Sequence, residues 1–443
     1  MARRVSEAGG RALIVGGWVR DRLLGRVSKD VDLEVFGLPA ARLRDLLEAF
    51  GSVNTVGESF TVYKVAGIDV SIPRRESKKG RGHRGFEVTG DPTLTSEAAA
   101  RRRDFTVNAI SWDPLTGEYL DPFNGRADLE ASILRVVDPR TFGDDSLRVL
   151  RAVQFAARFR LALDPDTRDL CRGIPLDDLP PERIWGEIEK LVLLAPRPSA
   201  GLELALDLGV IDRLFPELKA LVGCPQEPEW HPEGDVWVHT LLVIDRARER
   251  IDDLARAQQI TVMLGALCHD LGKPSTTAFT DGRIRSIDHE QAGVAPSALL
   301  LDRLNVHTID GYDVRRQVLG IVADHLKPGM FHQAPNPVSD GAFRRLAQRV
   351  DLELLARVAQ SDCLGRLGAF DCSAMDWFVA RARELGVQHA PPEPLVKGRH
   401  ILALGLSPGP EVGVILKQIY EKQLDGTITS LEQGLELARS LRR

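Results

Sequence analysis

Residues 16–24 read GGWVRDRLL, and residues 30–34 read DVDLE. The apolar run Ala12–Val15 precedes the first stretch, so the pattern predicts a strand that passes through a glycine turn into a helix. The run Val31–Phe36 predicts a second strand, rich in valine. Because side chains at i and i+2 of a strand share a face, the two aspartates of the second stretch are expected to point the same way. The two stretches therefore predict an α/β unit that carries a pair of carboxylates.

The elements predicted around these stretches complete a small mixed sheet. Residues 39–50 predict an amphipathic helix, and Thr61–Val65 with Ile68–Ile72 predicts a hairpin that turns at Gly67. After about Val136 the alternating pattern fades, and helical periodicity interrupted by prolines continues to the end. The predicted fold class is an α+β N-terminal head, with a small mixed sheet and helices, followed by all-α domains.

Length and composition limit the class of protein. At about 150 residues per domain, 443 residues predict about three folding units. The hydrophobic fraction of 43% and the charged fraction of 27% are ordinary for a water-soluble protein, and no apolar run reaches the ~18 residues of a membrane span. The N-terminus shows no secretory leader pattern. We therefore expect a cytoplasmic protein without a membrane partner.

The number and spacing of the cysteines and the distribution of charge also indicate which kinds of site the protein can carry. Five scattered cysteines without a CxxC pair favour free thiols over a disulfide framework or a zinc ribbon. The net charge of −5 argues against a uniformly basic coat for nucleic acid, but basic residues gather at 74–84 and at 101–103. Such patches can hold a phosphate backbone on an acidic protein. The alternative is a solvated loop.

The glycines and the paired carboxylates predict a site for phosphate and metal. Gly16 and Gly17 would let amides at a helix start approach a phosphate closely, although a tight turn would need the same residues. Asp30 and Asp32 on one strand face would repel each other unless a cation lay between them, and a pair of Mg²⁺ ions is the natural occupant. Two such ions would activate an attacking 3′-hydroxyl and stabilise a departing pyrophosphate. Asp69 is a candidate third carboxylate, with an exposed strand residue as the alternative.

These stretches resemble the opening motif of class II tRNA nucleotidyltransferases and bacterial poly(A) polymerases. Further resemblances follow in the family's order, namely RRDFTVNA at 102–109, DPFNGRADL at 121–129, DDSLR at 144–148 and ERIWGE at 182–187. The resemblance implies nucleotide transfer, for which the predicted catalytic residues are Asp30, Asp32 and the candidate Asp69, with Mg²⁺ as the metal. It also implies a set of nucleotide-binding residues, which comprises Gly16, Gly17, Arg20, Arg103, Asp104, Asn108, Asp145, Arg148 and Arg151.

A pair within the fourth motif suggests how a base would be chosen. Asp145 and Arg148 are three residues apart, so on a helix they would share a face. On a surface they would form only a salt bridge worth under ~1 kcal/mol. In a cleft, a carboxylate and a guanidinium would accept cytosine and adenine, which offer an amino donor beside a ring-nitrogen acceptor, and would reject uracil and guanine. The family usually has Glu at the position of Asp144, which leaves the orienting role of Asp144 open.

The resemblance implies addition of C, C and A to the 3′ end of tRNA from CTP and ATP. Residues 57–63 read GESFTVY where poly(A) polymerases usually carry Gly-Arg-Arg-Phe, and the long polar segment 74–95 contrasts with the shortened loop expected of CC-adding enzymes. A specialist that adds only CC or only A is the alternative. An RNA-binding scaffold with inactive sites is opposed by the intact carboxylate and base-reading pairs.

Histidines concentrate after residue 229. Residues 268–274, CHDLGKP, resemble the signature of the HD superfamily of metal-dependent phosphohydrolases. The resemblance implies four core ligands for Mn, Ni, Co, Fe or Mg²⁺, namely His239, His269, Asp270 and Asp362. Two further histidines, His289 and His325, would bind a second ion or the substrate phosphate. Lys273 would meet a phosphate oxygen. We hypothesise trimming of 2′,3′-cyclic phosphates at damaged tRNA ends, with an HD fold kept only as a scaffold as the alternative.

Clusters of proline and polar residues mark the expected boundaries. They predict a nucleotidyltransferase head at 1–136, a helical neck at 137–223, an HD domain at 224–388 and a helical tail at 389–443. The sequence does not decide whether the tail binds RNA, packs against the HD core or dimerises. A homodimer is therefore one of the predicted alternatives. The expected partners are the tRNA acceptor end, ATP and CTP.

Overall fold

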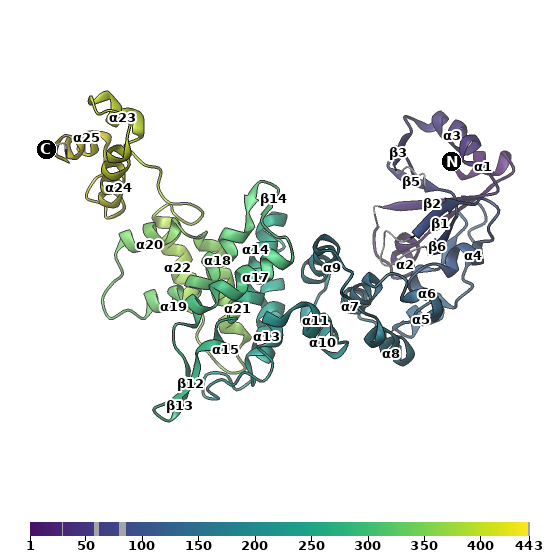
Figure 1. Cartoon of the computed structure of the whole chain (residues 1–443), viewed down its shortest axis with the longest axis horizontal. Coiled ribbons are helices and arrows are strands. Elements are labelled where there is room, and N and C mark those ends of the chain that lie inside the picture. Colours follow the sequence, from purple (N-terminus) through teal and green to yellow (C-terminus); the bar gives the residue numbers. More distant parts are fainter. Residues whose placement is uncertain (29, 57–61, 79–85, 442–443) are drawn as a thin grey trace. The chain divides into compact units, whose positions relative to one another are not determined.

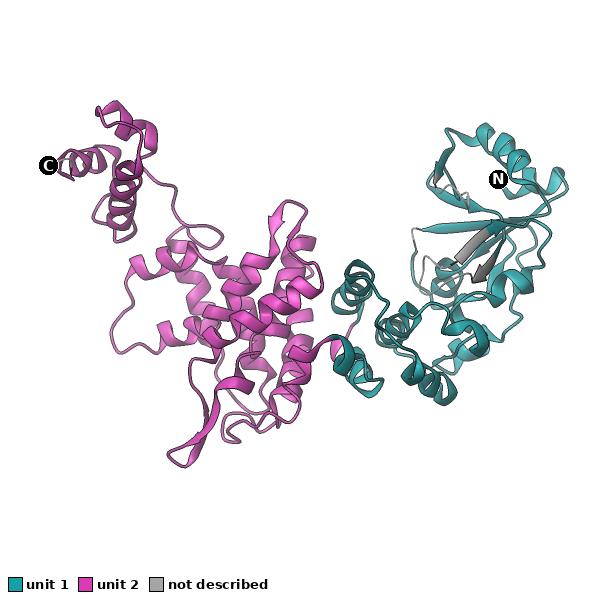
Figure 2. Cartoon of the chain, in the orientation of Figure 1, with its two compact units in different colours: residues 1–195, 200–214 teal, residues 196–199, 215–443 magenta. Residues whose placement is uncertain are grey.

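The computed structural model describes residues 1–28, 30–56, 62–78 and 86–441. The chain forms two units, one of residues 1–195 and 200–214 and one of residues 196–199 and 215–443 (Figure 2). No helix of the described part of the chain is both long and apolar enough to cross a membrane.

The first unit begins as a mixed α/β head and continues as helices (Figure 1). The elements of its head are α1 (Ala2–Glu7), β1 (Arg11–Val15), α2 (Gly17–Leu23), β2 (Val31–Phe36), α3 (Ala40–Leu47), η1 (Glu48–Phe50), β3 (Asn54–Val56), β4 (Val62–Val65), β5 (Ile68–Ser71), β6 (Arg74–Lys78), β7 (Phe86–Gly90), α4 (Ser96–Arg101), η3 (Thr106–Asn108), β8 (Ser111–Trp112), β9 (Tyr119–Leu120) and α5 (Gly125–Glu130). The later elements are β10 (Ile133–Leu134), α6 (Pro139–Phe142), α7 (Leu147–Phe159), β11 (Ala162–Leu163), α8 (Pro165–Gly173), α9 (Pro181–Leu194), α10 (Pro198–Asp207) and α11 (Val210–Leu214).

The head sheet has seven strands in the order β3-β4-β5-β2-β1-β8-β9. Its strands pair antiparallel except for β2 and β5, which are parallel and place Asp32 opposite Asp69. The predicted hairpin is confirmed, and Gly67 with φ 77° supplies the left-handed conformation that its turn needs. Leu43 and Leu47 of α3 are four residues apart and fully buried in the same apolar cluster as β2 and β5. The sheet therefore carries the carboxylate-bearing strand at its centre.

The helices after the sheet form the rest of the first unit. Phe105, just before η3, contacts Phe142 of α6 and Phe155 of α7 edge-on, with ring centroids 5.6 and 5.8 Å apart. Edge-to-face packing of this kind orients rings as well as burying them. These contacts fix α7 against the segment that follows α4, so residues of α7 and of the head line one cleft.

The second unit is mainly helical, and its elements are α12 (Pro216–Lys219), α13 (Val236–Arg248), α14 (Arg256–Cys268), α15 (Lys273–Thr276), β12 (Thr277–Thr280), β13 (Arg283–Ser286), α16 (His289–Ala292), α17 (Val294–Arg303), β14 (Thr308–Ile309), β15 (Tyr312–Asp313), α18 (Val314–Asp324), α19 (Lys327–His332), α20 (Asp340–Ala347), α21 (Leu352–Gly365), α22 (Ser373–Glu384), α23 (Gly398–Ala403), α24 (Pro410–Leu424) and α25 (Leu431–Leu441). Helices α13, α14, α18 and α21 pack together at its centre. Helices α23 to α25 bury an apolar cluster of their own around Ile401 and Ile419.

The expectation that this part of the chain is mainly helical is confirmed, and the structure differs from the predictions in two local features. Short hairpins interrupt the region expected to be helical throughout, and β12 pairs with β13 through Thr277 and Ser286. The strands are joined by Asp281 and Gly282, which both have a positive φ, and such a two-residue Asp-Gly turn is typical of a hairpin. The cysteines are also not all free, because Cys363 and Cys372 form a disulfide between α21 and the start of α22. Sequence spacing cannot show this pairing, because a disulfide forms only where the fold brings two Cα atoms within about 7 Å. Here the two Cα atoms lie 5.9 Å apart.

Candidate functional site

A polar cleft of about 790 Å³ lies in the first unit. Of the residues predicted to catalyse transfer or bind nucleotide, all twelve line it, namely Asp30, Asp32, Asp69, Gly16, Gly17, Arg20, Arg103, Asp104, Asn108, Asp145, Arg148 and Arg151. They come from the turn between β1 and α2 and from α2, from β2 and the residue before it, from β5, from the segment between α4 and the end of η3, and from α7 and the loop before it. Residues far apart in the sequence therefore meet in one place.

Three carboxylates gather at the β2–β5 side of the cleft. Asp30 and Asp32 both line it, and Asp69 is the register partner of Asp32 on the parallel strand. The Asp32 side chain reaches solvent, but packing around its carboxylate raises its pKa, the charges of Asp69 and Asp30 add to the rise, and the Arg103 charge opposes it. Asp69 is also ion-paired with Lys64 at 2.7 Å. The charges of Asp30 and Asp69 act unfavourably on that of Asp32, and a divalent cation among the three carboxylates would relieve this repulsion.

The turn before α2 brings the backbone close to these groups. Gly16 has φ 73°, a conformation that favours glycine. A Cβ atom placed there would lie 3.0 Å from an Arg103 guanidinium nitrogen and 3.7 Å from Oδ2 of Asp32. The glycine therefore leaves room beside a cation and a carboxylate, as an approaching phosphate would require.

Sequence reasoning missed Glu34, which continues the alternation of Asp30 and Asp32 along β2. Its side chain is buried, at 2% exposure, and accepts a hydrogen bond from Arg102 at 2.9 Å. The main-chain oxygen of Arg102 in turn accepts a hydrogen bond from Arg148 at 2.9 Å. The i, i+2 spacing from the predicted pair was the signal that could have found Glu34. Glu34 links the carboxylate strand to the segment that anchors Arg148.

A buried network joins four of the predicted nucleotide-binding residues. Arg151 donates to Asp104 at 2.7 Å, Asn108 donates to Asp104 at 3.0 Å, and Arg20 donates to Asn108 at 2.7 Å. Burial would raise the pKa of Asp104, but the Arg151 charge and the hydrogen bonds from Asn108 and Arg151 outweigh burial and lower it. The guanidinium of Arg20 also lies 4.0 Å from the Phe159 ring centroid. The network fixes polar groups at the cleft wall before any ligand binds.

The predicted base-reading pair needs one correction. Asp145 precedes α7 and does not lie on it, because the helix begins at Leu147. Asp145 instead accepts two hydrogen bonds from Arg183 of α9, at 3.0 and 2.8 Å, while Arg148 donates to main-chain oxygens of Arg102 and Thr141. The sequence named the motif around Arg183 but not this bidentate contact, because the two residues are 38 positions apart. The carboxylate and the guanidinium are held separately, and both line the cleft.

Two expectations fall on residues outside the described ranges. Lys79, Arg81 and Arg84 of the basic cluster lie in the gap at 79–85, and most of the GESFTVY stretch lies in the gap at 57–61. Arg74 and Arg75 are described; Arg74 lines the cleft, and Arg75 is paired with Asp91 at 2.6 Å.

In the second unit, all six residues predicted to bind metal converge on one centre. His239 lies on α13, His269 and Asp270 follow α14, and Asp362 lies on α21. His289 begins α16, and His325 follows α18. His239 Nε2 lies 3.0 Å from Asp362, and Nε2 of His269 and of His289 lie 3.2 and 3.3 Å from Asp270. Nε2 of His289 also lies 3.3 Å from Nε2 of His325.

Hydrogen bonds behind the four imidazoles determine which ring nitrogen faces the centre. His269, His289 and His325 direct Nδ1 at main-chain oxygens 2.8 to 2.9 Å away, and His239 directs Nδ1 at the Glu233 carboxylate at 2.8 Å. These oxygens only accept, so Nδ1 carries the proton and Nε2 of each neutral ring presents a lone pair. Four lone pairs and two carboxylates therefore face one another, which is unfavourable without a cation between them.

Burial strengthens this case for a metal. Among the described residues, the buried Nε2 atom of His269 has no hydrogen-bond partner. Burial would raise the pKa of Asp270, but the neighbouring His269 and Lys273 side chains lower it well below its usual value, so this carboxylate is ionised. Burial also lowers the pKa of His325 to about 3, so that ring stays neutral. Neutral imidazoles and ionised carboxylates are the forms that bind divalent metals.

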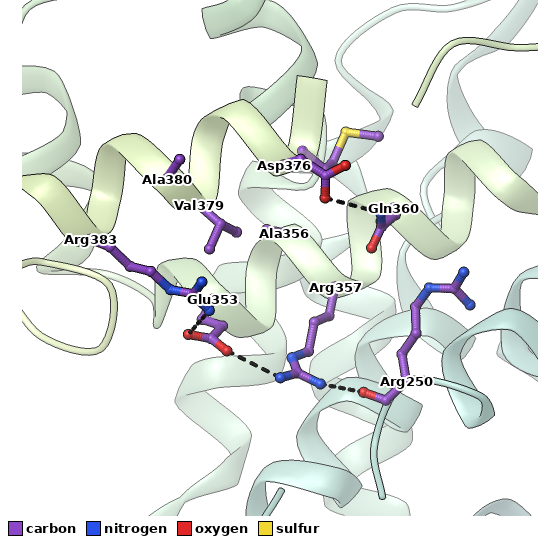
Figure 3. Close-up of a pocket in the computed structure, with 10 residues that line it drawn as sticks. Arg250, Glu353, Ala356, Arg357, Gln360, Asp376, Val379, Ala380 and Arg383 are labelled. Atoms are coloured by element: carbon purple, nitrogen blue, oxygen red, sulfur yellow. Dashed lines mark hydrogen bonds and ion pairs between the residues drawn. The ribbon is translucent and has the colours of Figure 1, made fainter. Parts of the chain in front are cut away.

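A separate hollow lies between α21 and α22 (Figure 3). Its charged side chains bind one another: Arg357 contacts Glu353 at 3.1 Å and the main-chain oxygen of Arg250 at 2.6 Å, and Arg383 contacts Glu353 at 3.2 Å. These contacts join the two helices and the end of α13. We interpret the hollow as part of the helix packing.

Family comparison gives two matches, one within the first unit and one that runs from it into the first residues of the second. The Poly A polymerase head domain matches residues 12–135. The probable RNA and SrmB-binding site of polymerase A matches residues 162–221. The first match covers the sheet with its carboxylates, and the second begins shortly after α7.

Similar proteins match over most of the chain. The "Multifunctional CCA protein" of Xanthomonas oryzae is 37% identical over 421 residues, which cover 91% of this chain and 95% of that protein. The "Multifunctional CCA protein" of Stenotrophomonas maltophilia is 39% identical over 376 residues, covering 81% and 87%. In fold, the chain resembles the Bacillus stearothermophilus CCA-adding enzyme in complex with CTP, with a TM-score of 0.65 at 22% identity and coverage of 100% of this chain and 96% of that one.

Proposed function

Because the chain belongs to the family of multifunctional CCA proteins, we propose that it adds C, C and A to the 3′ end of tRNA from CTP and ATP, with release of pyrophosphate. One observation carries this proposal: the carboxylates Asp30, Asp32 and Asp69 line the same cleft as Asp145 and Arg148. A catalytic group and a base-selecting group must lie within reach of one nucleotide for untemplated addition.

The carboxylates fit two Mg²⁺ ions. Burial raises the pKa of Asp32 and the charges of Asp69 and Asp30 raise it further, whereas a divalent cation would lower it. When bound, the ions would activate the 3′-hydroxyl and stabilise the departing pyrophosphate. Asp30 and Asp32 would hold them, and Asp69 would complete the set as its contact with Lys64 rearranges.

The remaining cleft residues divide between phosphate and base. Amides after Gly16, together with Arg103, would meet the triphosphate, and the buried network that joins Asp104, Asn108, Arg20 and Arg151 would hold the sugar and phosphates.

Asp145 and Arg148 would read the amino group and ring nitrogen of C or A. The two hydrogen bonds from Arg183 supply the orientation of Asp145 that a Glu at position 144 would otherwise give.

The assay is direct. Purified protein is incubated with tRNA transcripts that end before the first C, before the terminal A, or after the complete CCA, with CTP and ATP separately and together, and the products are sequenced. We expect CMP and AMP incorporation, little UMP or GMP, and none with Asp30→Ala. Incorporation of CMP alone or AMP alone would identify a specialist, a run of A would identify a poly(A) polymerase, and no incorporation would indicate an inactive scaffold.

We further propose that the second unit is an HD phosphohydrolase that removes phosphate from damaged tRNA ends, including 2′,3′-cyclic phosphate. The convergence of four Nε2 atoms on Asp270 and Asp362 carries this proposal. Mixed nitrogen and oxygen ligands suit Mn, Ni, Co or Fe as well as Mg²⁺. Lys273 lies 2.8 Å from Asp270 and would meet a phosphate oxygen. Phosphodiesterase activity that survives in a His269→Ala/Asp270→Ala double variant would refute the proposal.

We assign these activities to a head at 1–136 with a neck at 137–223, and to an HD domain at 224–388 followed by a tail at 389–443. The tRNA acceptor end is the proposed partner of the first unit, with Mg²⁺, CTP and ATP.

A further inference from the structure

Glu233 lies three residues before α13 and makes three hydrogen bonds in the second unit. Its Oε1 atom accepts from Nδ1 of His239 at 2.8 Å and from Nδ1 of His231 at 2.9 Å. Its Oε2 atom accepts from the main-chain N–H of Leu367 at 3.1 Å. The carboxylate has no solvent exposure. A buried carboxylate with this many specific contacts has a defined task, since burying it unpaired would be costly.

The contact with His239 differs in kind from those of the other three imidazoles. His269, His289 and His325 give their Nδ1 protons to main-chain carbonyl oxygens, whereas His239 gives its proton to a charged group. A carboxylate behind a ligating imidazole fixes its orientation and tautomer and raises the basicity of the nitrogen that faces the metal. His239 is therefore the most strongly polarised nitrogen ligand of the centre.

Glu233 also joins two segments that carry ligands. His239 is on α13, and Leu367 follows Asp362 by five residues, beyond the end of α21. Nε2 of His239 and Oδ1 of Asp362 lie 3.0 Å apart on the metal side. The carboxylate thus holds both segments from behind, so the spacing of the two ligands depends on it.

We propose that Glu233 is a positioning residue of the metal centre: it holds His239 with Nε2 toward Asp362 and sets the affinity of the centre for a divalent ion. This inference rests on the proposed metal-dependent function of the second unit. Glu233 is not itself a ligand, because its Oε1 is occupied by two N–H groups at 2.8 and 2.9 Å, and a metal there would have to displace both protons.

The test is a titration of metal-free full-length protein with Co²⁺ alone, followed by the visible absorption of the bound ion. For Glu233→Gln we expect the Kd for Co²⁺ to rise about 10- to 100-fold and the visible bands to shift, because the neutral amide polarises His239 less. Glu233→Asp keeps the charge and is expected to recover part of the affinity. Far-UV circular dichroism of the metal-free variants checks that their helices are intact.

The matched control is Asp351→Asn. Asp351 is also buried, at 3% exposure, and it accepts from Nδ1 of His389 at 3.1 Å, but neither residue belongs to the metal centre. We expect this variant to bind Co²⁺ within about twofold of wild type, as a site without a role in metal binding should.

Several results would overturn the proposal. Glu233→Gln could bind Co²⁺ with the wild-type Kd and spectrum, or both Glu233 variants could lose their helical signal, which would reduce Glu233 to a residue needed only for folding. If wild-type protein bound no Co²⁺, this inference and the metal centre would both be wrong. If wild-type protein bound Co²⁺ but hydrolysed no phosphate ester, only the phosphohydrolase proposal would fail, and the Glu233 comparison would stand.

Discussion

The cleft of the first unit and the histidine centre of the second both contain several carboxylates. The two sites differ in the solvent exposure of these carboxylates and in the side chains that surround them. In the cleft, Asp30 and Asp32 are exposed, and the charged groups that act on Asp32 are Arg103, Lys64 and the carboxylates of Asp69 and Asp30. In the centre, Asp270 and Asp362 are buried among imidazoles that present lone pairs. Both arrangements call for a cation, but only the second excludes water from most of its ligands.

The difference teaches how each centre would exchange its metal. Open carboxylates suit a hard ion that keeps several waters and can enter with a triphosphate. Buried imidazoles, each fixed by a hydrogen bond behind it, suit an ion that stays with the protein. We therefore expect Mg²⁺ at the cleft to be lost on simple dialysis and the ion of the histidine centre to need a chelator.

The largest expected effect concerns the exposed carboxylates of the cleft in the first unit. Asp32→Ala removes a proposed ligand and should lower the rate of nucleotide addition by on the order of 10³-fold or more, since metal stabilisation of the transition state is worth several kcal/mol. Phosphodiesterase activity should not change. The measurement is CMP incorporation into a tRNA transcript that lacks CCA. Asp169→Ala is the control, because that carboxylate is 76% exposed and lies on α8. A comparable loss of activity in the Asp169→Ala control would contradict the proposal that Asp32 is a metal ligand.

The second prediction contrasts an exposed carboxylate of the cleft with a buried one. Asp104→Asn leaves the Arg151 charge without its partner and should lower the free energy of unfolding by about 3 kcal/mol at pH 7. Because the folded state lowers the pKa of Asp104, its contribution is complete above the unfolded value near 4 and is lost as the pH falls through the folded value. Urea unfolding of both proteins from pH 7 to pH 3.5 should show the gap shrink below about pH 4. A gap independent of pH would contradict the assignment.

The third prediction concerns the rigidity of the buried centre. The disulfide spans nine positions, from Cys363 beside Asp362 to Cys372. Opening it with Cys372→Ser should lower the free energy of unfolding of the second unit by about 2–3 kcal/mol, by the loop-entropy relation. Urea unfolding without reductant measures the effect. Adding dithiothreitol should bring wild type to the level of the variant and leave the variant unchanged; a wild type insensitive to reductant would show that the bond does not form.

The smallest expected effect concerns selectivity within the cleft. Arg183→Ala frees Asp145 from its two hydrogen bonds, so the ratio of kcat/KM for CTP over UTP should fall about 10-fold, or about 1.4 kcal/mol. Arg168→Ala removes a comparable contact with Asp207 outside the cleft and serves as the control. A ratio that Arg183→Ala leaves unchanged would mean that Asp145 is oriented by other groups.

Local patterns predicted much of this molecule. The strand over Val31–Phe36 was placed correctly because alternation is a property of neighbouring residues, and the hairpin around Gly67 because its turn needs a left-handed conformation. The six residues of the histidine centre could be named in advance because the resemblance supplied their order, and the structure brings them together.

Contacts between distant residues could not be predicted in the same way. The pairing of Arg183 with Asp145, the clamp of Arg102 on Glu34 and the disulfide depend on how helices and strands pack. The sequence by itself determined which side chains carry charge, proton or metal-binding chemistry. Only the tertiary structure decided which of them face one another, because their meeting depends on the burial of apolar faces contributed by the whole chain.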